Sequence, residues 1–184
     1  MCSRYLMTHL DCTLRDGGYY NDWDFSPELI YDYLNSMVAL NVDFVEIGLR
    51  SLINEGFKGG CAFSTDTYIN ILPIPLELRN KIGVMINGSE LVAEQSGPSN
   101  GPKQLFDQKT VLKKLFAPKN ESPVSLVRIT CHVHEFEACL PAATWLKEQG
   151  YLVGFNLMQV ADSSQAEISQ LAKKASAYPI DALY

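Results

Sequence analysis

The sequence predicts an α/β fold in which a parallel sheet is curled into a (β/α) TIM-type barrel. The first observation is that short apolar runs rich in β-forming residues alternate with helical segments along the chain. This alternation indicates strand–helix–strand units and a parallel sheet. The runs comprise residues 9–14, 44–49, 81–86, 126–131, 152–158 and 180–184.

The second observation is that the runs divide into an aliphatic face and a mixed polar face, because side chains alternate across a strand. Glu46 then shares its face with Arg50. Both faces of a parallel sheet are normally covered, and buried charges are costly unless they pair or bind a ligand. In a barrel, the polar face lines a lumen. We therefore expect Asp11, Arg15, Glu46 and Arg128 to form one charged cluster there. An open doubly wound parallel sheet is the alternative.

Three segments between the runs carry helix signals. "SPELIYDYLNSMVALN" begins with Ser26 as an N-cap, and "EFEACLPAATWLKEQG" ends at Gly150. Pro141 either kinks the second helix or marks a later start. "SSQAEISQLAKKASAY" is expected to turn Ile168 and Leu171 inward. These helices supply the outer layer of the predicted barrel.

Composition limits the class of protein. A chain of 184 residues with 47% hydrophobic residues is expected to form one globular domain, residues 1–184. A net charge of −6 argues against nucleic acid and anionic membranes as partners. No run approaches a signal peptide or a membrane span, which predicts a cytoplasmic protein. The five cysteines include no CxxC pair, so we expect reduced thiols, with Cys12 and Cys131 as small buried apolar groups.

Four stretches identify a resemblance to a known family. They are "TLRDGG" at residues 13–18, "FVEIG" at 44–48, "VRITCHVHEFE" at 127–137 and "GYLVGFNLMQ" at 150–159. In this order they resemble the first, second, fourth and fifth strands of the metal-dependent aldolase and lyase superfamily with a hydroxymethylglutaryl-CoA-lyase-like barrel. The opening "DCTLRDGGY" resembles the aldolase branch, which includes 4-hydroxy-2-oxovalerate aldolase.

The resemblance implies a lyase that cleaves or forms a carbon–carbon bond next to a small 2-oxo acid through an enolate. Asp16 would be a ligand of a divalent metal, Mn²⁺ or Mg²⁺, and Arg15 would bind the substrate and stabilise the enolate oxygen. A metal and a guanidinium suit this chemistry because negative charge builds up on oxygen. Glu46 would hold the arginine in place, either as part of the catalytic site or as a structural salt bridge. The alternative for "RDG" is a surface turn.

Tyr19 occupies the position at which relatives carry His or Gln. Tyrosine can donate a proton, but its ordinary pKa near 10 makes it a poor base. Its presence leaves the substrate and the direction of reaction open.

Two further residues are candidates for substrate contact at the barrel mouth. His132 belongs to "HVH" with His134, but the family's metal-binding HxH follows the sixth strand, whereas this one ends the fourth run. His132 is therefore a candidate for substrate contact, with metal contact as an alternative. Gln159, at the end of the fifth run, is expected to face the same pocket.

The length suggests an incomplete barrel. "PIDALY" resembles the sixth strand, and a complete barrel takes about 250 residues, so residues 1–184 are expected to form its N-terminal part without the metal-binding HxH. Metal would then bind weakly or not at all, and the chain would be inactive alone. Unpaired strand edges would favour self-association. A non-catalytic barrel remnant that serves as an interaction or scaffold module is the alternative function.

Overall fold

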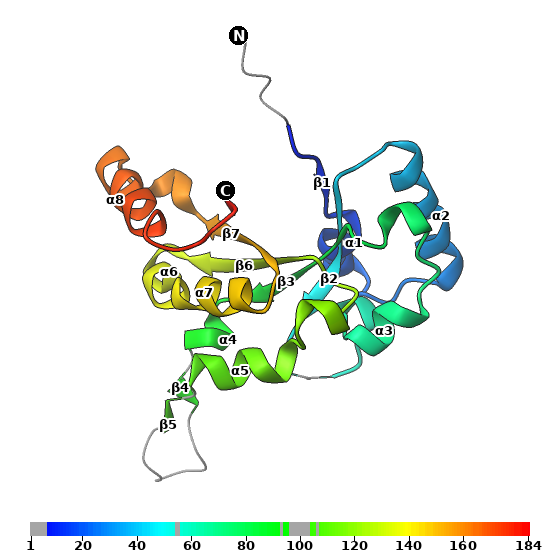
Figure 1. The fold of residues 1–184 in the computed structure, drawn as a ribbon, viewed down its shortest axis with the longest axis horizontal. Helices are drawn as coiled ribbons and strands as arrows, with labels where there is room; N and C mark the ends of the chain where they lie inside the picture. Colours follow the sequence, from blue (N-terminus) through cyan, green and yellow to red (C-terminus); the bar gives the residue numbers. More distant parts are fainter. Residues whose placement is uncertain (1–6, 54–55, 93, 96–103, 106) are drawn as a thin grey trace.

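A computed structural model describes residues 7–53, 56–92, 94–95, 104–105 and 107–184. Its main sheet has six strands, all parallel to their neighbours, in the order β1-β2-β3-β6-β7-β8 (Figure 1). The strands are β1 (Leu10–Asp11), β2 (Phe44–Arg50), β3 (Ile82–Asn87), β6 (Leu126–His132), β7 (Leu152–Met158) and β8 (Ala182–Leu183). A separate antiparallel pair joins β4 (Glu94–Gln95) and β5 (Gln104–Leu105).

The strand order distinguishes a barrel from an open doubly wound sheet. Each new strand of the main sheet is added beside the preceding one, always at the same edge. A doubly wound sheet reverses direction at a switch point, and this sheet does not. Figure 1 shows α2 beside β1 and β2 at one end of the sheet, and α8 beyond β7 at the other. The six parallel strands form a curled half-barrel, which confirms the predicted fold class.

The helices begin and end where local chemistry favours it. Those described are α1 (Thr13–Gly17), α2 (Pro27–Ala39), α3 (Asp66–Ile71), α4 (Ser89–Val92), α5 (Gln108–Leu115), α6 (Val133–Cys139), α7 (Pro141–Glu148) and α8 (Gln165–Ala175). The Ser26 hydroxyl accepts a hydrogen bond from the Leu29 amide, which caps α2 as predicted. None of the helices in this part of the chain is long and apolar enough to cross a membrane.

The later helices both confirm and correct the sequence reading. Pro141 begins a new helix, α7, and Gly150 follows its end with a positive φ of 94°. Ser164 and Glu167 form a capping box at the start of α8. Ile168, however, is 41% exposed rather than turned inward. Leu171 is half-buried and packs against the core as expected, and Ala175 is buried. Lys174 pairs with Glu137 of α6, so α8 packs through its C-terminal half.

The hydrophobic core lies between the aliphatic face of the sheet and the surrounding helices. Strand residues such as Val45, Val84 and Ile129 are fully buried there, and they belong to the same core as Leu34 of α2 and Leu146 of α7. This burial supplies the main driving force for folding. The predicted division of the strands into two faces is therefore correct over most of the sheet.

A β-bulge in β2 changes which side chains share a face. Glu46 lies opposite Gly83 of β3, but Gly48 lies opposite Val84, so one extra residue is inserted at Ile47. After the bulge Arg50 aligns with the buried Ile86. The prediction that Arg50 shares a face with Glu46 is therefore wrong.

Arg50 is instead bound on the helix side of the sheet. Its guanidinium donates to the Ser64 carbonyl at 2.9 Å and to the Leu115 carbonyl at 2.8 Å, and it pairs with Asp66. These contacts join β2 to α3 and α5, so Arg50 has a structural role in the outer layer.

Asp11 also lies on the helix side, contrary to the sequence expectation. It aligns with Val45 in the core, and its carboxylate accepts a hydrogen bond of 2.5 Å from the Tyr33 hydroxyl of α2. The strand ends directly after Asp11, whose carboxylate also accepts from the Thr13 amide at 2.9 Å, and α1 begins there. Arg15 therefore enters the lumen from a helical turn rather than from a strand.

Replacing Gly48 tests the packing of the bulge. A Cβ at Gly48 would lie 1.9 Å from the Cys61 carbonyl oxygen, whereas a Cβ at Gly83 on the neighbouring strand would approach nothing closer than 3.6 Å. We expect Gly48→Ala to lower the free energy of unfolding by about 1–3 kcal/mol or more, because the obstacle is backbone. Gly83→Ala, the matched control, should change it by less. Urea denaturation measures both, and equal effects would contradict the described packing.

The Asp11–Tyr33 contact predicts a pH-dependent stability. Burial raises the pKa of Asp11, but the hydrogen bonds from Tyr33 and Thr13 outweigh it and hold the pKa below its ordinary value of 3.8. The contact therefore stabilises the fold at neutral pH, and this contribution is lost as pH falls through the lowered pKa. We expect Asp11→Asn to lower the free energy of unfolding by about 1 kcal/mol at pH 7.

Denaturation curves from pH 7 to pH 3 test this expectation. The difference between the wild type and Asp11→Asn should shrink at the acidic end. Asp32→Asn, an exposed site on the same helix as Tyr33, serves as the control and should have little effect at any pH. A loss that is independent of pH would contradict the assigned contact.

Candidate active site

Arg15 and Asp16 lie in α1, directly after β1. This is the C-terminal end of a parallel strand, the edge at which barrel enzymes carry reactive groups. The two neighbours differ in exposure: Arg15 is 8% exposed, whereas the Asp16 side chain is 56% exposed. Asp16 can therefore meet a ligand from solvent while Arg15 is fixed within the protein.

Glu46 connects Arg15 to the interior of the half-barrel. Its side chain is fully buried, and it accepts a hydrogen bond of 2.7 Å from Arg15 Nε. Arg128 Nη1, from β6, donates to both Glu46 oxygens at 3.2 Å. We call Arg15, Glu46 and Arg128 the lumen cluster. The predicted charged cluster is thus confirmed for these three residues and is wrong for Asp11.

The lumen cluster joins two guanidinium groups to one buried carboxyl group. Burial lowers the pKa of Arg15, but contact with Glu46 outweighs it and raises the pKa above its ordinary value, so this guanidinium stays cationic. Burial raises the pKa of Glu46, although Arg128 and Arg15 act in the opposite direction. Two guanidinium groups surround one buried carboxyl group, and the half-exposed Asp16, which also pairs with Arg15, supplies the second negative charge. An anionic ligand would therefore compete with Asp16 for the Arg15 guanidinium.

Arg128 is held by its neighbours but is not saturated with hydrogen bonds. It stacks over the Tyr184 ring, with Cζ 4.9 Å from the ring centroid. A Cβ at Gly154 would lie 3.2 Å from Arg128 Cγ, so the glycine makes room for the arginine stem. Arg128 Nε is buried and has no hydrogen-bond partner among the described residues. The Arg128 Nε–H is therefore a hydrogen-bond donor of the lumen cluster that no described residue uses.

Asp16 bridges Arg15 and Cys12. One carboxylate oxygen pairs with Arg15, and the other accepts a hydrogen bond of 3.3 Å from Cys12 Sγ. Burial and the neighbouring carboxylate raise the pKa of the Cys12 thiol, so it remains a donor. Cys131 is fully buried as predicted, but Cys12 is only half-buried and makes this polar contact. The expectation for Cys12 is therefore wrong.

Tyr19 and Trp23 lie in the segment that follows α1. Tyr19 is 67% exposed, and its ring packs edge-on against Trp23 with centroids 4.7 Å apart. Trp23 is buried, and its Nε1–H donates to the Arg15 carbonyl at 2.9 Å. Sequence reasoning did not find Trp23, because nothing local signals that its side chain folds back onto Arg15.

His132 and Gln159 lie at the ends of the adjacent strands β6 and β7. The His132 ring stacks on His134 with centroids 5.5 Å apart, and its backbone amide is bound by Glu135 at the start of α6. Gln159 is exposed and has a positive φ of 59°. In the part of the chain that the structure describes, no hydrogen bond or ion pair joins either residue to Arg15 or Asp16. Their contact with substrate stays a prediction.

The described residues do not form a complete metal site. Asp16 offers one half-exposed carboxylate, but no group of three or more His, Cys, Asp or Glu in these ranges is arranged to hold a metal ion. Divalent cations held by proteins need several ligands. Among the described residues, Asp16 is therefore the candidate ligand that the resemblance assigns, without a second and third ligand grouped around it.

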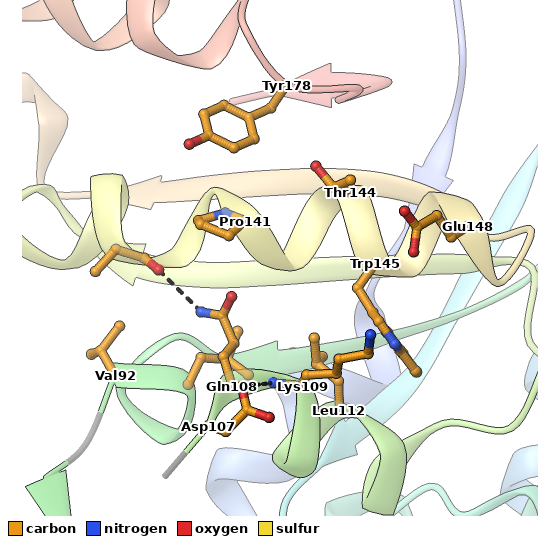
Figure 2. A pocket seen from close by; sticks show the side chains of 12 residues that line it. Val92, Asp107, Gln108, Lys109, Leu112, Pro141, Thr144, Trp145, Glu148 and Tyr178 are labelled. Carbon is orange, nitrogen blue, oxygen red and sulfur yellow. Dashed lines mark hydrogen bonds between the residues drawn. The ribbon is translucent and has the colours of Figure 1, made fainter. Parts of the chain in front are cut away.

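Two cavities have different relations to this site. One of about 240 Å³ lies at the ends of β2 and β3 and includes Tyr19, Trp23, Leu49 and Asn87 in its lining. Another of about 720 Å³ lies between α5 and α7, where Figure 2 shows Trp145 and neighbouring side chains. The second lies on the outer helical layer, and neither cavity is lined by a residue of the lumen cluster.

Comparison with known proteins gives a structural neighbour but no family. No protein-family model matches the chain, and no curated protein matches it. A crystal structure described as "the N-terminal domain of a putative aldolase from Bacteroides vulgatus" aligns with a TM-score of 0.61. The two share 22% identity over 96% of this chain and 62% of the bacterial one. At this identity the likeness shows the fold, and the chain spans under two thirds of its neighbour.

Proposed function

We propose that this chain carries the enolate-stabilising part of a divalent-metal-dependent aldolase or lyase that acts on 2-oxo acids. The observation that carries the proposal is the buried Arg15, which Glu46 fixes at 2.7 Å beside the half-exposed Asp16 at a strand end. The aldolase description of the bacterial neighbour supports the same reaction class.

The reaction requires a site that accepts negative charge on oxygen. In cleavage of a 4-hydroxy-2-oxo acid, the C3–C4 bond breaks and its electron pair moves onto the C2 oxygen as an enolate. The C4 hydroxyl loses its proton, so an aldehyde leaves, and protonation of the enolate at C3 gives pyruvate. Arg15, preorganised by Glu46, is suited to bind the C2 oxygen because it costs no reorganisation as charge develops. The two guanidinium groups of the lumen cluster support binding of such an anion, which would replace Asp16 as the partner of Arg15.

The three remaining candidate residues, Tyr19, His132 and Gln159, are proposed to contact the substrate away from the enolate oxygen. Tyr19 is proposed to exchange a proton with the substrate, because it is exposed and packs on Trp23, whose indole binds the Arg15 carbonyl. His132 and Gln159 are proposed to contact the substrate from the ends of β6 and β7. The cavity at the ends of β2 and β3 contains Tyr19 and Trp23, the two aromatic residues of the segment that follows Arg15 and Asp16.

Asp16 is proposed to bind a divalent metal, Mn²⁺ or Mg²⁺, weakly in this chain. When bound, the metal would supply positive charge for the enolate oxygen. Asp16 also has an electrostatic role of its own. The Asp16 carboxylate balances the charge of Arg15. A metal ion that drew this carboxylate away would leave the Arg15 guanidinium free to bind an anion.

A second function, that of a non-catalytic interaction module, is favoured by the sheet edges. Within the described residues β1 pairs only with β2, and β8 pairs only with β7. Open edges can pair with another chain, so we propose self-association through them. This function requires no anion binding at Arg15.

Binding of oxalate, a dianion that resembles the enolate of pyruvate, tests the proposal. We expect calorimetry of the 184-residue chain to show saturable oxalate binding. Arg15→Lys should weaken it by about tenfold, because lysine keeps the charge but loses the planar fork. Arg79→Lys, at an exposed arginine, should match the wild type.

Repeating the titration with Mn²⁺ separates the two functions. Mn²⁺ should strengthen oxalate binding by the wild type but not by Asp16→Asn. If the wild type binds no oxalate with or without Mn²⁺, or if Arg15→Lys behaves as Arg79→Lys does, the enzymatic proposal is wrong and the interaction module is preferred.

A further inference from the structure

Trp23 makes a contact that the proposed chemistry does not use. It is 5% exposed, and its only polar side-chain atom, Nε1, donates to the main-chain carbonyl of Arg15 at 2.9 Å. The bond runs eight residues back along the chain, from the loop after α1 to the middle of α1. Trp23 therefore acts on the backbone that carries Arg15, not on its guanidinium.

The backbone around Trp23 adopts conformations that few side chains tolerate. Asp22 and Trp23 both have positive φ angles, 54° and 58°, which disfavour residues other than glycine. Strain of this kind persists only where surrounding structure holds it. Here it turns the indole back toward α1.

Two glycines make room for this arrangement. A Cβ at Gly18 would lie 1.9 Å from the Trp23 ring, and a Cβ at Gly59 would lie 2.0 Å from the Trp23 carbonyl oxygen. The Gly59 amide also donates to the Asp22 carbonyl at 2.8 Å, which joins the segment 18–24 to the segment that follows β2. Trp23 is thus clamped from both sides, and no side chain could replace either glycine without displacing it.

We propose that Trp23 is a positioning residue that sets the place of Arg15 in the lumen cluster. α1 has only five residues, which is too short to be stable alone, so its geometry depends on contacts such as this one. The indole N–H holds the Arg15 carbonyl, and the side chain of Arg15 then reaches Glu46 at 2.7 Å. The effect on catalysis rests on the proposed function, whereas the effect on Arg15 geometry does not.

The chain contains two tryptophans, which provides a matched pair of variants. Trp23→Phe keeps an aromatic ring but removes the donor, and Trp145→Phe makes the same change at a 9% exposed site of α7. The readout is hydrogen exchange of the Arg15 Nε–H by ¹⁵N NMR, since this proton lies in the bond to Glu46. In Trp23→Phe we expect exchange to speed up by about fivefold or more, as for the loss of one neutral hydrogen bond.

Trp145→Phe should leave the exchange of Arg15 Nε–H unchanged, and urea denaturation of both variants corrects for any general loss of stability. In the wild type, the Trp23 indole proton should exchange more slowly than a free indole, a measurement that needs no variant. Unchanged Arg15 exchange in Trp23→Phe, an equal change in Trp145→Phe, or an unprotected Trp23 indole would each overturn the proposal. Oxalate affinity measured on the same samples reports separately on the proposed function.

Discussion

The buried carboxyl group of Glu46 is the contact on which the rest of the site depends. It is fully enclosed, and a buried acid without partners would be costly. Arg15 from α1 and Arg128 from β6 satisfy it, so one side chain of β2 ties together three separate segments of the chain. Arg128 also stacks on Tyr184, which directly follows β8, so the cluster is connected to the last strand of the sheet as well. On the interior face of the half-barrel this charged cluster lies next to the buried Met85, which aligns with Arg128.

The sheet and the loops place this contact at the reactive edge. The strands are added in sequential order and are all parallel to their neighbours, so their C-terminal ends lie at the same edge of the curled sheet. The bulge at Ile47 leaves Glu46 on that face while it turns Arg50 to the outer layer. Trp23 and Gly59 then join the loop after β1 to the segment after β2. Arg15 is consequently fixed both through its side chain and through its backbone.

Much of the fold follows from sequence because it depends on periodicity that can be read locally. Alternating strands and helices indicated the parallel sheet, and charges on an otherwise aliphatic strand pattern indicated the cluster at Glu46 and Arg128. The failures have specific physical causes. Asp11 was misplaced because β1 ends after two residues, which breaks the assumed alternation. Arg50 was misplaced because a bulge is not visible without the partner strand.

Other features could not be found from sequence because they are tertiary. The bond from Trp23 to Arg15 accompanies two consecutive residues with positive φ; Asp22 is of a type that tolerates this conformation, but nothing local signals it for Trp23. The thiol of Cys12 faces Asp16 only because α1 starts directly after it. The "RDG" stretch is likewise a helical turn rather than the end of a strand, which explains how Arg15 can be buried while Asp16 is half-exposed.

The most direct test of this account is a double-mutant cycle between Glu46 and Arg128, with free energies of unfolding measured in urea. Glu46→Gln leaves the buried Arg128 without its charged partner and Arg15 with only the half-exposed Asp16, so it should destabilise the protein by about 3 kcal/mol or more. Adding Arg128→Met should recover part of that loss, because one unpaired charge is removed. Strictly additive losses would show that the two side chains do not interact, and would contradict the charged lumen on which the proposed site depends.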